Sequence, residues 1–303
     1  SNINDYLNYC TSQKRLDTKT LKAYRIDLKQ FTDFISITEP SEITPNLLEN
    51  YISFLHNNFK PKTVKRKIAS LKALFHYFEY KDIIEYNPFN KLYIKFKEPV
   101  ILPKVIPLST IERLLSTIYN QQINGNTFNK KHNSIRDAAV CELLFATGIR
   151  ISELCSLHDN DIDLQNGIIK IYGKGSKERV LQIGNNATLK ALTRYKSEFS
   201  DKINACDFFF VNNNSTPLSA QAVRRMLNKY TKLANINMHI TPHMFRHTFA
   251  TCLLNADVDI RYIQEMLGHS SINVTEIYTH VAIEKQGTIL KEKHPRKFLN
   301  ITY

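Results

Sequence analysis

Apolar residues recur at intervals of three and four along the first part of the chain, a spacing that places their side chains on one face of an α-helix. Residues 20–35 show this pattern at Leu21, Tyr24, Leu28, Phe31 and Ile35. A second such stretch opens with Thr44 and Pro45, which is typical of a helix start because threonine caps the first amides and proline needs no amide hydrogen bond there. The pattern predicts a domain of amphipathic helices.

Residues 60–78 combine the same apolar spacing with a run of positive charge. The apolar positions are Val64, Ile68, Leu71, Phe75 and Phe78, and basic residues crowd the start and the outer side of this predicted helix. No acidic residue occurs between Glu49 and Glu79, whereas a helix face that is merely solvated usually carries both signs. We therefore expect contacts with the DNA backbone, made by Lys65, Arg66, Lys67 and Lys72.

Prolines interrupt the helical pattern near residue 100. They are Pro99, Pro103 and Pro107. Because proline removes a helix hydrogen bond and fixes its own backbone, residues 99–107 are predicted to be an extended linker. The linker divides a helical domain, residues 1–98, from a second domain, residues 108–303.

The second domain opens with further helical signals. Ser109 with Glu112 three residues later forms a capping box, which predicts a helix start at that point. Residues 120–134 are polar and aperiodic, so an exposed loop is expected there. Residues 135–147 predict a helix that ends at Gly148, because glycine readily adopts the left-handed conformation of a helix end.

A short sheet then interrupts the helices. Arg150 precedes a short predicted helix at residues 152–157, and the apolar pattern changes to that of strands at residues 168–172 and 178–184. The glycine-rich turn between these strands holds Lys174 at its tip. The sequence therefore predicts a mainly α fold with a small antiparallel β-sheet.

The composition adds a strong positive charge, with 41 Lys and Arg against 28 Asp and Glu, for a formal net charge of +13. Basic residues exceed acidic ones in both predicted domains, which favours a polyanionic partner over a basic protein without one. Nucleic acid is favoured over a membrane because no segment has the apolar length needed to span one. A helix over residues 219–234 adds a cluster that is either plain surface or DNA-binding: Arg224, Arg225 and Lys229.

The five cysteines are scattered and form no Cys-x-x-Cys pair, a distribution typical of reduced thiols. We therefore expect a cytoplasmic protein.

The segment HMFRH, residues 243–247, places His243, Arg246 and His247 on one face of a helix. Histidines at this spacing also bind zinc in metalloproteases. Here the glutamate that would activate a zinc-bound water is absent, and Arg246 puts a permanent cation between the two histidines. The face is better suited to an anion than to a metal.

Further residues of the same chemical character occur around this segment. Arg150, Lys174 and His269 are cations or hydrogen-bond donors, as His243 and Arg246 are, and no acid is obviously placed to neutralise them. Tyr278 lies nine residues after His269 and adds a phenol. A tyrosine with apolar neighbours is usually a core residue, but donors and a phenol together suggest a phosphodiester substrate.

Four segments of the chain resemble, in this order, the signature segments of tyrosine recombinases, most closely those of the Xer type: ATGIRISEL, GKGSKERV, HMFRHTFAT and LGHSSINVTEIYTHV. The resemblance covers the whole chain and implies a helical core-binding domain followed by a catalytic domain. It also implies a C-terminal tail, about residues 283–303, for contacts between protomers. Departures from the family pattern are the polar stretch at 120–134 and Cys252, where relatives often carry a histidine.

The resemblance implies a catalytic set, which is Arg150, Lys174, His243, Arg246, His269 and Tyr278. Tyr278 is expected to attack a DNA phosphate and form a 3′-phosphotyrosyl link, while His243 takes up or shares its proton. Arg150 and Arg246 are expected to bind the non-bridging oxygens, and His269 to add a donor. Lys174 is expected to protonate the departing 5′-oxygen. No metal, nucleotide or other cofactor is expected, and His247 is expected to support the helix through a buried hydrogen bond.

The implied function is site-specific recombination of double-stranded DNA through a four-way junction. The implied assembly is a tetramer, either of one protein or of a pair of relatives. Resolution of chromosome or plasmid dimers is the Xer-like reading, favoured because no arm-binding domain precedes the helical one. The alternatives are a mobile-element integrase, a relaxing topoisomerase of similar chemistry and a catalytically silent DNA-binding regulator. The target site and any activating motor protein are left open by the sequence.

Overall fold

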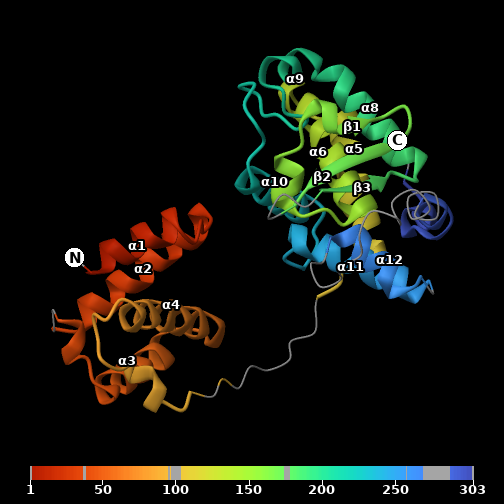
Figure 1. Ribbon diagram of the computed structural model, residues 1–303. Helices are drawn as coiled ribbons and strands as arrows, with labels where there is room; N and C mark the ends of the chain where they lie inside the picture. Colours follow the sequence, from red (N-terminus) through yellow and green to blue (C-terminus); the bar gives the residue numbers. More distant parts are fainter. Residues whose placement is uncertain are drawn as a thin grey trace. The chain divides into compact units, whose positions relative to one another are not determined.

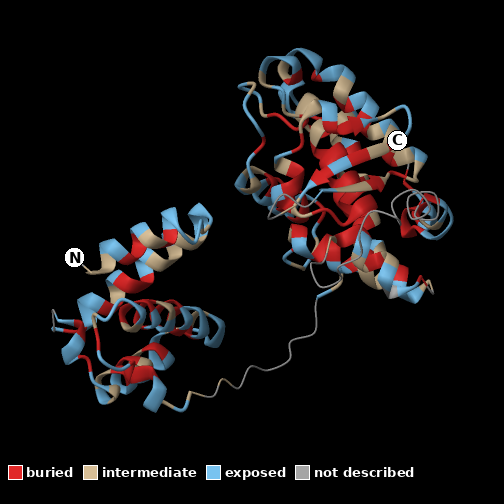
Figure 2. Ribbon diagram, viewed as in Figure 1, coloured by how far each residue is buried: buried red, intermediate tan, exposed pale blue. Residues whose placement is uncertain are grey.

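The computed structural model describes residues 2–36, 39–94, 96, 104–173, 178–256, 258–268 and 287–301. The chain divides into two compact units, residues 1–101 and 102–303 (Figure 1). Each unit has its own apolar core (Figure 2). Lys174, His269 and Tyr278 lie outside the described residues.

The first unit is helical, as predicted. Its elements are α1 (Asn2–Ser12), α2 (Thr18–Phe34), η1 (Pro40–Glu42), α3 (Pro45–Asn58), α4 (Pro61–Tyr80) and η2 (Pro88–Lys91). The predicted start of α3 is confirmed, because the Thr44 side chain accepts a hydrogen bond from the Leu47 amide and Pro45 is the first helical residue. Phe31, Tyr51 and Phe75 pack edge to face in the core that α2, α3 and α4 share.

Lys67 departs from the predicted orientation of α4. Its side chain is 5% exposed, and its ammonium donates to Oδ1 of the buried Asp27 on α2 at 2.9 Å. Arg66 pairs with the other carboxylate oxygen of Asp27. The expectation that Lys67 lies on the outer side and contacts DNA is therefore wrong, because the neighbouring helix supplies a carboxylate that holds it in the interior.

The second unit combines helices with a small sheet, so the predicted fold class is confirmed. Its elements are α5 (Leu108–Asn124), α6 (Phe128–Thr147), α7 (Ile151–Cys155), η3 (Asp159–Asp161), β1 (Ile162–Asp163), β2 (Ile168–Tyr172), β3 (Glu178–Gln182), α8 (Asn186–Glu198), α9 (Ser200–Cys206), α10 (Ala220–Leu233), α11 (Pro242–Asn255), α12 (Ile260–Leu267) and η5 (Pro295–Phe298). The strands are antiparallel in the order β1-β2-β3, and Ile169 pairs with Leu181 in the core-facing row. Helix α6 is central, since α5, α8 and α11 all pack against it.

Two local predictions at the start of this unit are wrong. The predicted helix start is confirmed, since α5 begins at Leu108, but the predicted capping box is wrong: no side chain caps the helix, and the Glu112 carboxylate instead accepts a hydrogen bond from the amide of Asn300, far along the chain. The exposed loop expected at 120–134 is mostly helix, because α6 starts at Phe128, where the Thr127 side chain caps it by accepting from the Lys130 amide. The polar composition of this stretch reflects exposed helix ends rather than a long loop.

The C-terminal residues pack into the core of their own unit. Residues 287–293 are helical, and Leu290, Leu299 and Ile301 are buried in the apolar cluster of the second unit. Arg296 forms a buried ion pair with Glu142 of α6 at 3.0 Å. Residues 287–301 therefore pack on their own unit in the single chain, and contacts of this tail with another protomer stay a prediction.

No helix among the described residues is long and apolar enough to cross a membrane. The cysteines, Cys10, Cys141, Cys155, Cys206 and Cys252, all carry free thiols, in agreement with the prediction from their spacing.

Candidate active site

The site begins at the end of α6, which places Arg150. Gly148 ends the helix with φ +60°, and a Cβ there would lie 2.8 Å from the Phe249 ring, so only glycine fits this turn. The chain then turns so that Arg150 becomes the N-terminal residue flanking α7, with its side chain about one third exposed. Arg150 is therefore fixed by a tight turn between two helices.

Arg246 joins three elements at this point. Its side chain is buried, and it donates from Nη1 to the carbonyl of Gly148 at 2.9 Å and from Nη2 to the carbonyl of Leu267 at 2.5 Å. Burial and the nearby charge of Arg150 lower the pKa of Arg246 to about 10, which still leaves it charged at neutral pH. A buried guanidinium whose geometry is fixed by carbonyls is suited to binding phosphate oxygens.

Glu153 balances part of this positive charge. Its carboxylate accepts hydrogen bonds from the Arg150 backbone amide at 2.9 Å and from Arg150 Nη1 at 2.8 Å. Arg179 of β3 donates to both oxygens, at 2.9 and 2.8 Å. Burial acts in the opposite direction, but the hydrogen bonds and charge of Arg179 and Arg150 prevail and lower the pKa of Glu153 to about 2.

Neither Glu153 nor Arg179 was among the predicted site residues, and the expectation that no acid neutralises the site is wrong. The signal for Glu153 was its position three residues after Arg150, within reach on a helix. No comparable local signal pointed to Arg179, because the strand and α7 meet only in the folded unit.

His243 lies on α11, one turn before Arg246, and it is exposed. Partial burial is the largest effect on its imidazole, followed by electrostatic interactions with His247, Arg246, Arg224 and Arg150, and together these lower its pKa below the usual 6.5. At neutral pH the ring is therefore uncharged and able to accept a proton. The electrostatic effect of Arg224 on His243 shows that this residue of α10 also acts on the candidate site.

His247 does not take the expected role. The expectation of a buried hydrogen bond is wrong, because the side chain is exposed at the surface of α11. Within the part of the chain that the structure describes, no group of three or more His, Cys, Asp or Glu residues could hold a metal ion.

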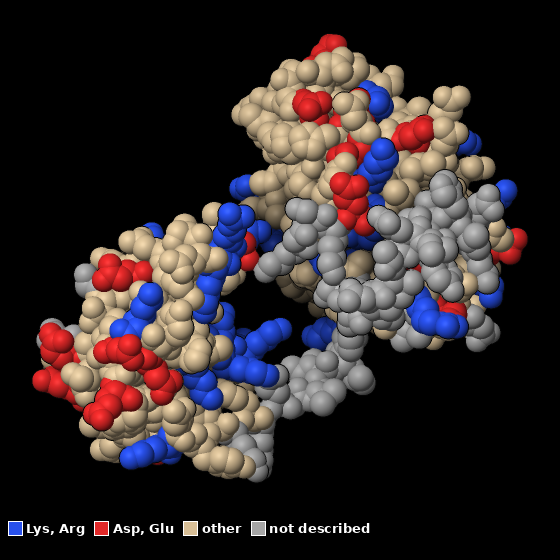
Figure 3. Space-filling model, viewed as in Figure 1, with Lys and Arg blue, Asp and Glu red and all other residues tan. Residues whose placement is uncertain are grey.

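The residues predicted to bind DNA, apart from Lys67, are exposed. They are Lys65, Arg66, Lys72, Arg224, Arg225 and Lys229. On the first unit, Figure 3 shows most of the visible Lys and Arg side chains along one side and most of the visible acidic side chains on the other. This separation of charge would give the unit a positive face.

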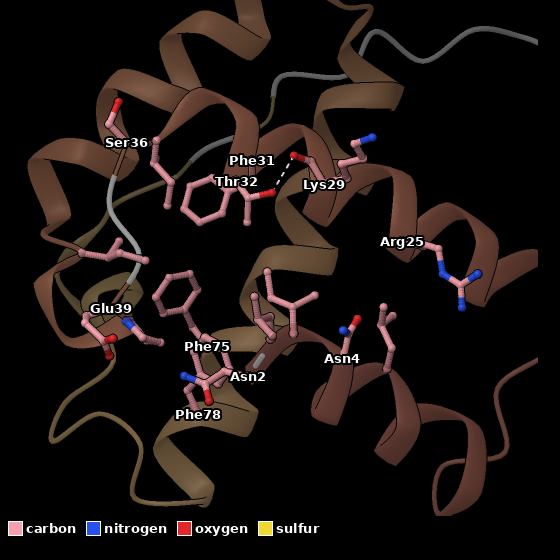
Figure 4. Close-up of a pocket in the computed structure, with 16 residues that line it drawn as sticks. Asn2, Asn4, Arg25, Lys29, Phe31, Thr32, Ser36, Glu39, Phe75 and Phe78 are labelled. Carbon is pink, nitrogen blue, oxygen red and sulfur yellow. Dashed lines mark hydrogen bonds between the residues drawn. The ribbon is translucent and has the colours of Figure 1, made fainter.

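A cavity of about 860 Å³ lies in the first unit, and none of the residues predicted to bind DNA lines it. Phe31, Phe75 and Phe78 line it, with Arg25 and Lys29 toward its outer side (Figure 4). It includes none of the residues predicted to be catalytic.

Comparisons with known proteins agree with the geometry. The sequence pattern described as "Phage integrase family" matches residues 108–285, and that described as "Phage integrase, N-terminal SAM-like domain" matches residues 3–81. A tyrosine recombinase of Agathobacter rectalis is 62% identical over 98% of this chain and 97% of its own length. The tyrosine recombinase XerD of Listeria innocua is 35% identical over 97% of this chain and 98% of its own.

The fold is also that of solved recombinases. The crystal structure of a lambda integrase dimer bound to a COC′ core site aligns with a TM-score of 0.69 at 18% identity, over 91% of this chain and 98% of that one. The chain belongs to the phage integrase family. It is a tyrosine-type site-specific DNA recombinase, so the family and activity implied by the four motifs are confirmed.

Proposed function

We propose that the chain cuts and rejoins double-stranded DNA through a 3′-phosphotyrosyl link to Tyr278, with Arg150, Lys174, His243, Arg246 and His269 as the other catalytic residues. The observation that carries this proposal is the convergence of Arg150 and Arg246, from two different elements, beside an imidazole whose pKa is lowered. Two guanidinium groups and an uncharged imidazole are what a phosphodiester and an attacking phenol require.

The chemistry divides between these groups. The Tyr278 phenol, with an ordinary pKa near 10, must lose its proton as it attacks phosphorus, and neutral His243 accepts it. Arg150 and Arg246 donate to the non-bridging oxygens as negative charge develops on them. His269 adds a donor, and Lys174 protonates the departing 5′-oxygen. The phosphotyrosyl link conserves the energy of the phosphodiester, so a 5′-hydroxyl of another strand reverses the step without cofactor.

DNA binding is assigned to the basic residues of both units. Lys65, Arg66 and Lys72 of α4, with Arg224, Arg225 and Lys229 of α10, contact the phosphate backbone, so affinity falls steeply with salt. Solved relatives include a lambda integrase tetramer bound to a Holliday junction and an XerH recombinase bound to difH. From these relatives we infer that this chain also works as a tetramer on two paired DNA sites.

The biological role that we propose is Xer-like, the resolution of chromosome or plasmid dimers. The named relatives that cover nearly the whole chain include XerD and XerC proteins, which supports this role. Integration by a mobile element shares the chemistry and is the second candidate.

The test begins by identifying the DNA site through covalent capture of genomic fragments on the purified protein. Two copies of the captured site are then placed in direct repeat on one supercoiled plasmid. A recombinase separates the plasmid into two circles, whereas a topoisomerase only relaxes it and a silent regulator leaves it unchanged. Relaxation without resolution, or DNA binding without cleavage, contradicts the proposed function.

A further inference from the structure

Arg179, on strand β3, is bound on all three of its guanidinium nitrogens. Nη1 and Nη2 donate to the two oxygens of Glu153, and Nε donates to the carbonyl of Met266 at 2.9 Å. The side chain is only 11% exposed. Arg179 is therefore placed to hold other groups in position rather than to reach DNA.

Through Glu153, Arg179 acts on Arg150. The carboxylate that Arg179 grips on both oxygens also receives the backbone amide and Nη1 of Arg150. Because the pKa of Glu153 is lowered to about 2, the carboxylate stays ionised at every pH at which the protein works. The hydrogen bonds from Arg179 to Glu153 and from Arg150 to Glu153 thus link strand β3 to the Arg150 guanidinium in the active site.

Arg179 also contacts the end of α12. A Cβ at Gly268 would lie 2.9 Å from Nη1 of Arg179, and Gly268 has φ +66°, so the guanidinium fills the space beside a glycine turn. Arg150 Nη2 donates to the carbonyl of the same Gly268 at 3.3 Å. The two arginines therefore share both a carboxylate and a helix end, whose carbonyls carry partial negative charge.

We propose that Arg179 is a positioning residue for the cleavage reaction. This proposal rests on the function proposed above for Arg150. It holds Glu153, and thereby the Arg150 guanidinium, in the orientation that binds the non-bridging phosphate oxygens. Strand β3 is also one arm of the hairpin whose turn contains Lys174 in the sequence, so the same contacts tie that arm to the arginine. A lysine cannot replace Arg179, because a single ammonium cannot bind both oxygens in parallel and a carbonyl as well.

The test compares Arg179→Lys with a matched control, Arg136→Lys. Arg136 is 12% exposed and donates from Nε at 3.1 Å and from Nη2 at 2.7 Å to one oxygen of Asp137, so both substitutions exchange the guanidinium of a buried ion pair in the same unit for an ammonium. The probe is the duplex recovered by covalent capture on the wild-type protein. We expect Arg179→Lys to bind it with unchanged affinity and to cleave it on the order of 10- to 100-fold more slowly, the penalty of a misplaced catalytic group. Arg136→Lys should cleave at the wild-type rate.

A second readout separates positioning from general damage. A methylphosphonate at the cleaved position replaces one charged non-bridging oxygen with a methyl group, so cleavage depends less on Arg150. The ratio of methylphosphonate to phosphate cleavage rates should rise in Arg179→Lys and in Arg150→Ala, but not in Arg136→Lys. If Arg179→Lys does not fold, Glu153→Gln, which removes the charge while keeping the shape, should give the same rise.

The outcomes are distinguishable. A wild-type protein that forms no covalent adduct overturns the proposed function, and this inference with it. A wild-type protein that cleaves while Arg179→Lys cleaves equally fast overturns the inference alone. Slow cleavage by Arg179→Lys with an unchanged ratio of methylphosphonate to phosphate cleavage rates also overturns the inference, because the loss of activity then reflects general structural damage.

Discussion

Replacing Arg296 with methionine should strongly destabilise the second unit. Arg296 and Glu142 have side chains that are 3% and 0% exposed, and Arg296 donates to both carboxylate oxygens from Nε at 3.1 Å. Glu142 also accepts from the hydroxyl of Tyr119 at 2.9 Å and from that of Thr188 at 3.2 Å. Methionine fills much of the volume but leaves the Glu142 charge buried without its cation.

The magnitude follows from that unpaired charge. Removing one partner of a buried ion pair costs about 3–5 kcal/mol, a large share of the roughly 5–15 kcal/mol that stabilises a typical domain. Adding Glu142→Gln to the Arg296→Met variant should recover part of the loss, because the amide carries no charge, its oxygen still accepts from one of the hydroxyls of Tyr119 and Thr188, and its NH2 can donate to the other.

The assay is urea unfolding, followed by hydrogen exchange of α6 amides, at several protein concentrations. The control is Arg261→Met, since Arg261 is 79% exposed in its pair with Asp259 and exposed pairs contribute at most about 1 kcal/mol. A loss below about 1 kcal/mol in Arg296→Met would contradict this prediction. A loss seen only at concentrations where chains associate would show that the tail packs on a neighbouring protomer instead.

Other predictions concern catalysis and DNA binding. The cleavage rate should be constant at neutral pH and should fall in acid as His243 becomes protonated. The midpoint of the pH–rate profile should lie below pH 6.5, because the pKa of this imidazole is lowered. A midpoint above pH 6.5 would contradict the role of His243 as the base. Lys67→Met should lower stability without changing the salt dependence of DNA binding, whereas Lys65→Met should reduce that dependence, as measured by fluorescence anisotropy across a salt series. The Lys174→Ala variant should cleave ordinary DNA slowly, but its cleavage rate should recover on a substrate with sulfur at the 5′-bridging position, because a thiolate leaves without a proton. The rate of Arg150→Ala should recover much less on the same substrate. Equal rescue of both variants would show that Lys174 is not the general acid.

Local patterns predicted the elements well where the chain's own neighbours decide them. The cap at Thr44, the stop at Gly148 and the strands on either side of the glycine-rich turn all depend on residues a few positions apart. The candidate arginines were found by motifs for the same reason. Such signals place a residue on an element, but they do not say what that element packs against.

The failures share this limit. Lys67 lies three residues after Val64 and four before Leu71, so its spacing already placed it on the apolar face, but its charge argued for the surface. Its burial depends on Asp27, on a different helix. At 120–134 the polar composition did not indicate the two helix ends that lie there. One of them, the start of α6, packs through His132, whose ring stacks on Phe199 with 4.1 Å between the ring centroids. In each case a partner distant in the sequence decides the outcome.

The proposed function is tested most directly by locating the covalent bond between the protein and DNA. Wild-type protein is incubated with the captured duplex in EDTA, denatured, digested with nuclease and trypsin, and examined by tandem mass spectrometry. We expect a nucleotide remnant linked through a 3′-phosphate to Tyr278 and not to Tyr262, the other tyrosine of the same tryptic peptide. Tyr278→Phe should bind the duplex and give no adduct. A remnant on another residue, a 5′-phosphate linkage, or an adduct that forms only when a divalent metal is restored would contradict the proposed function.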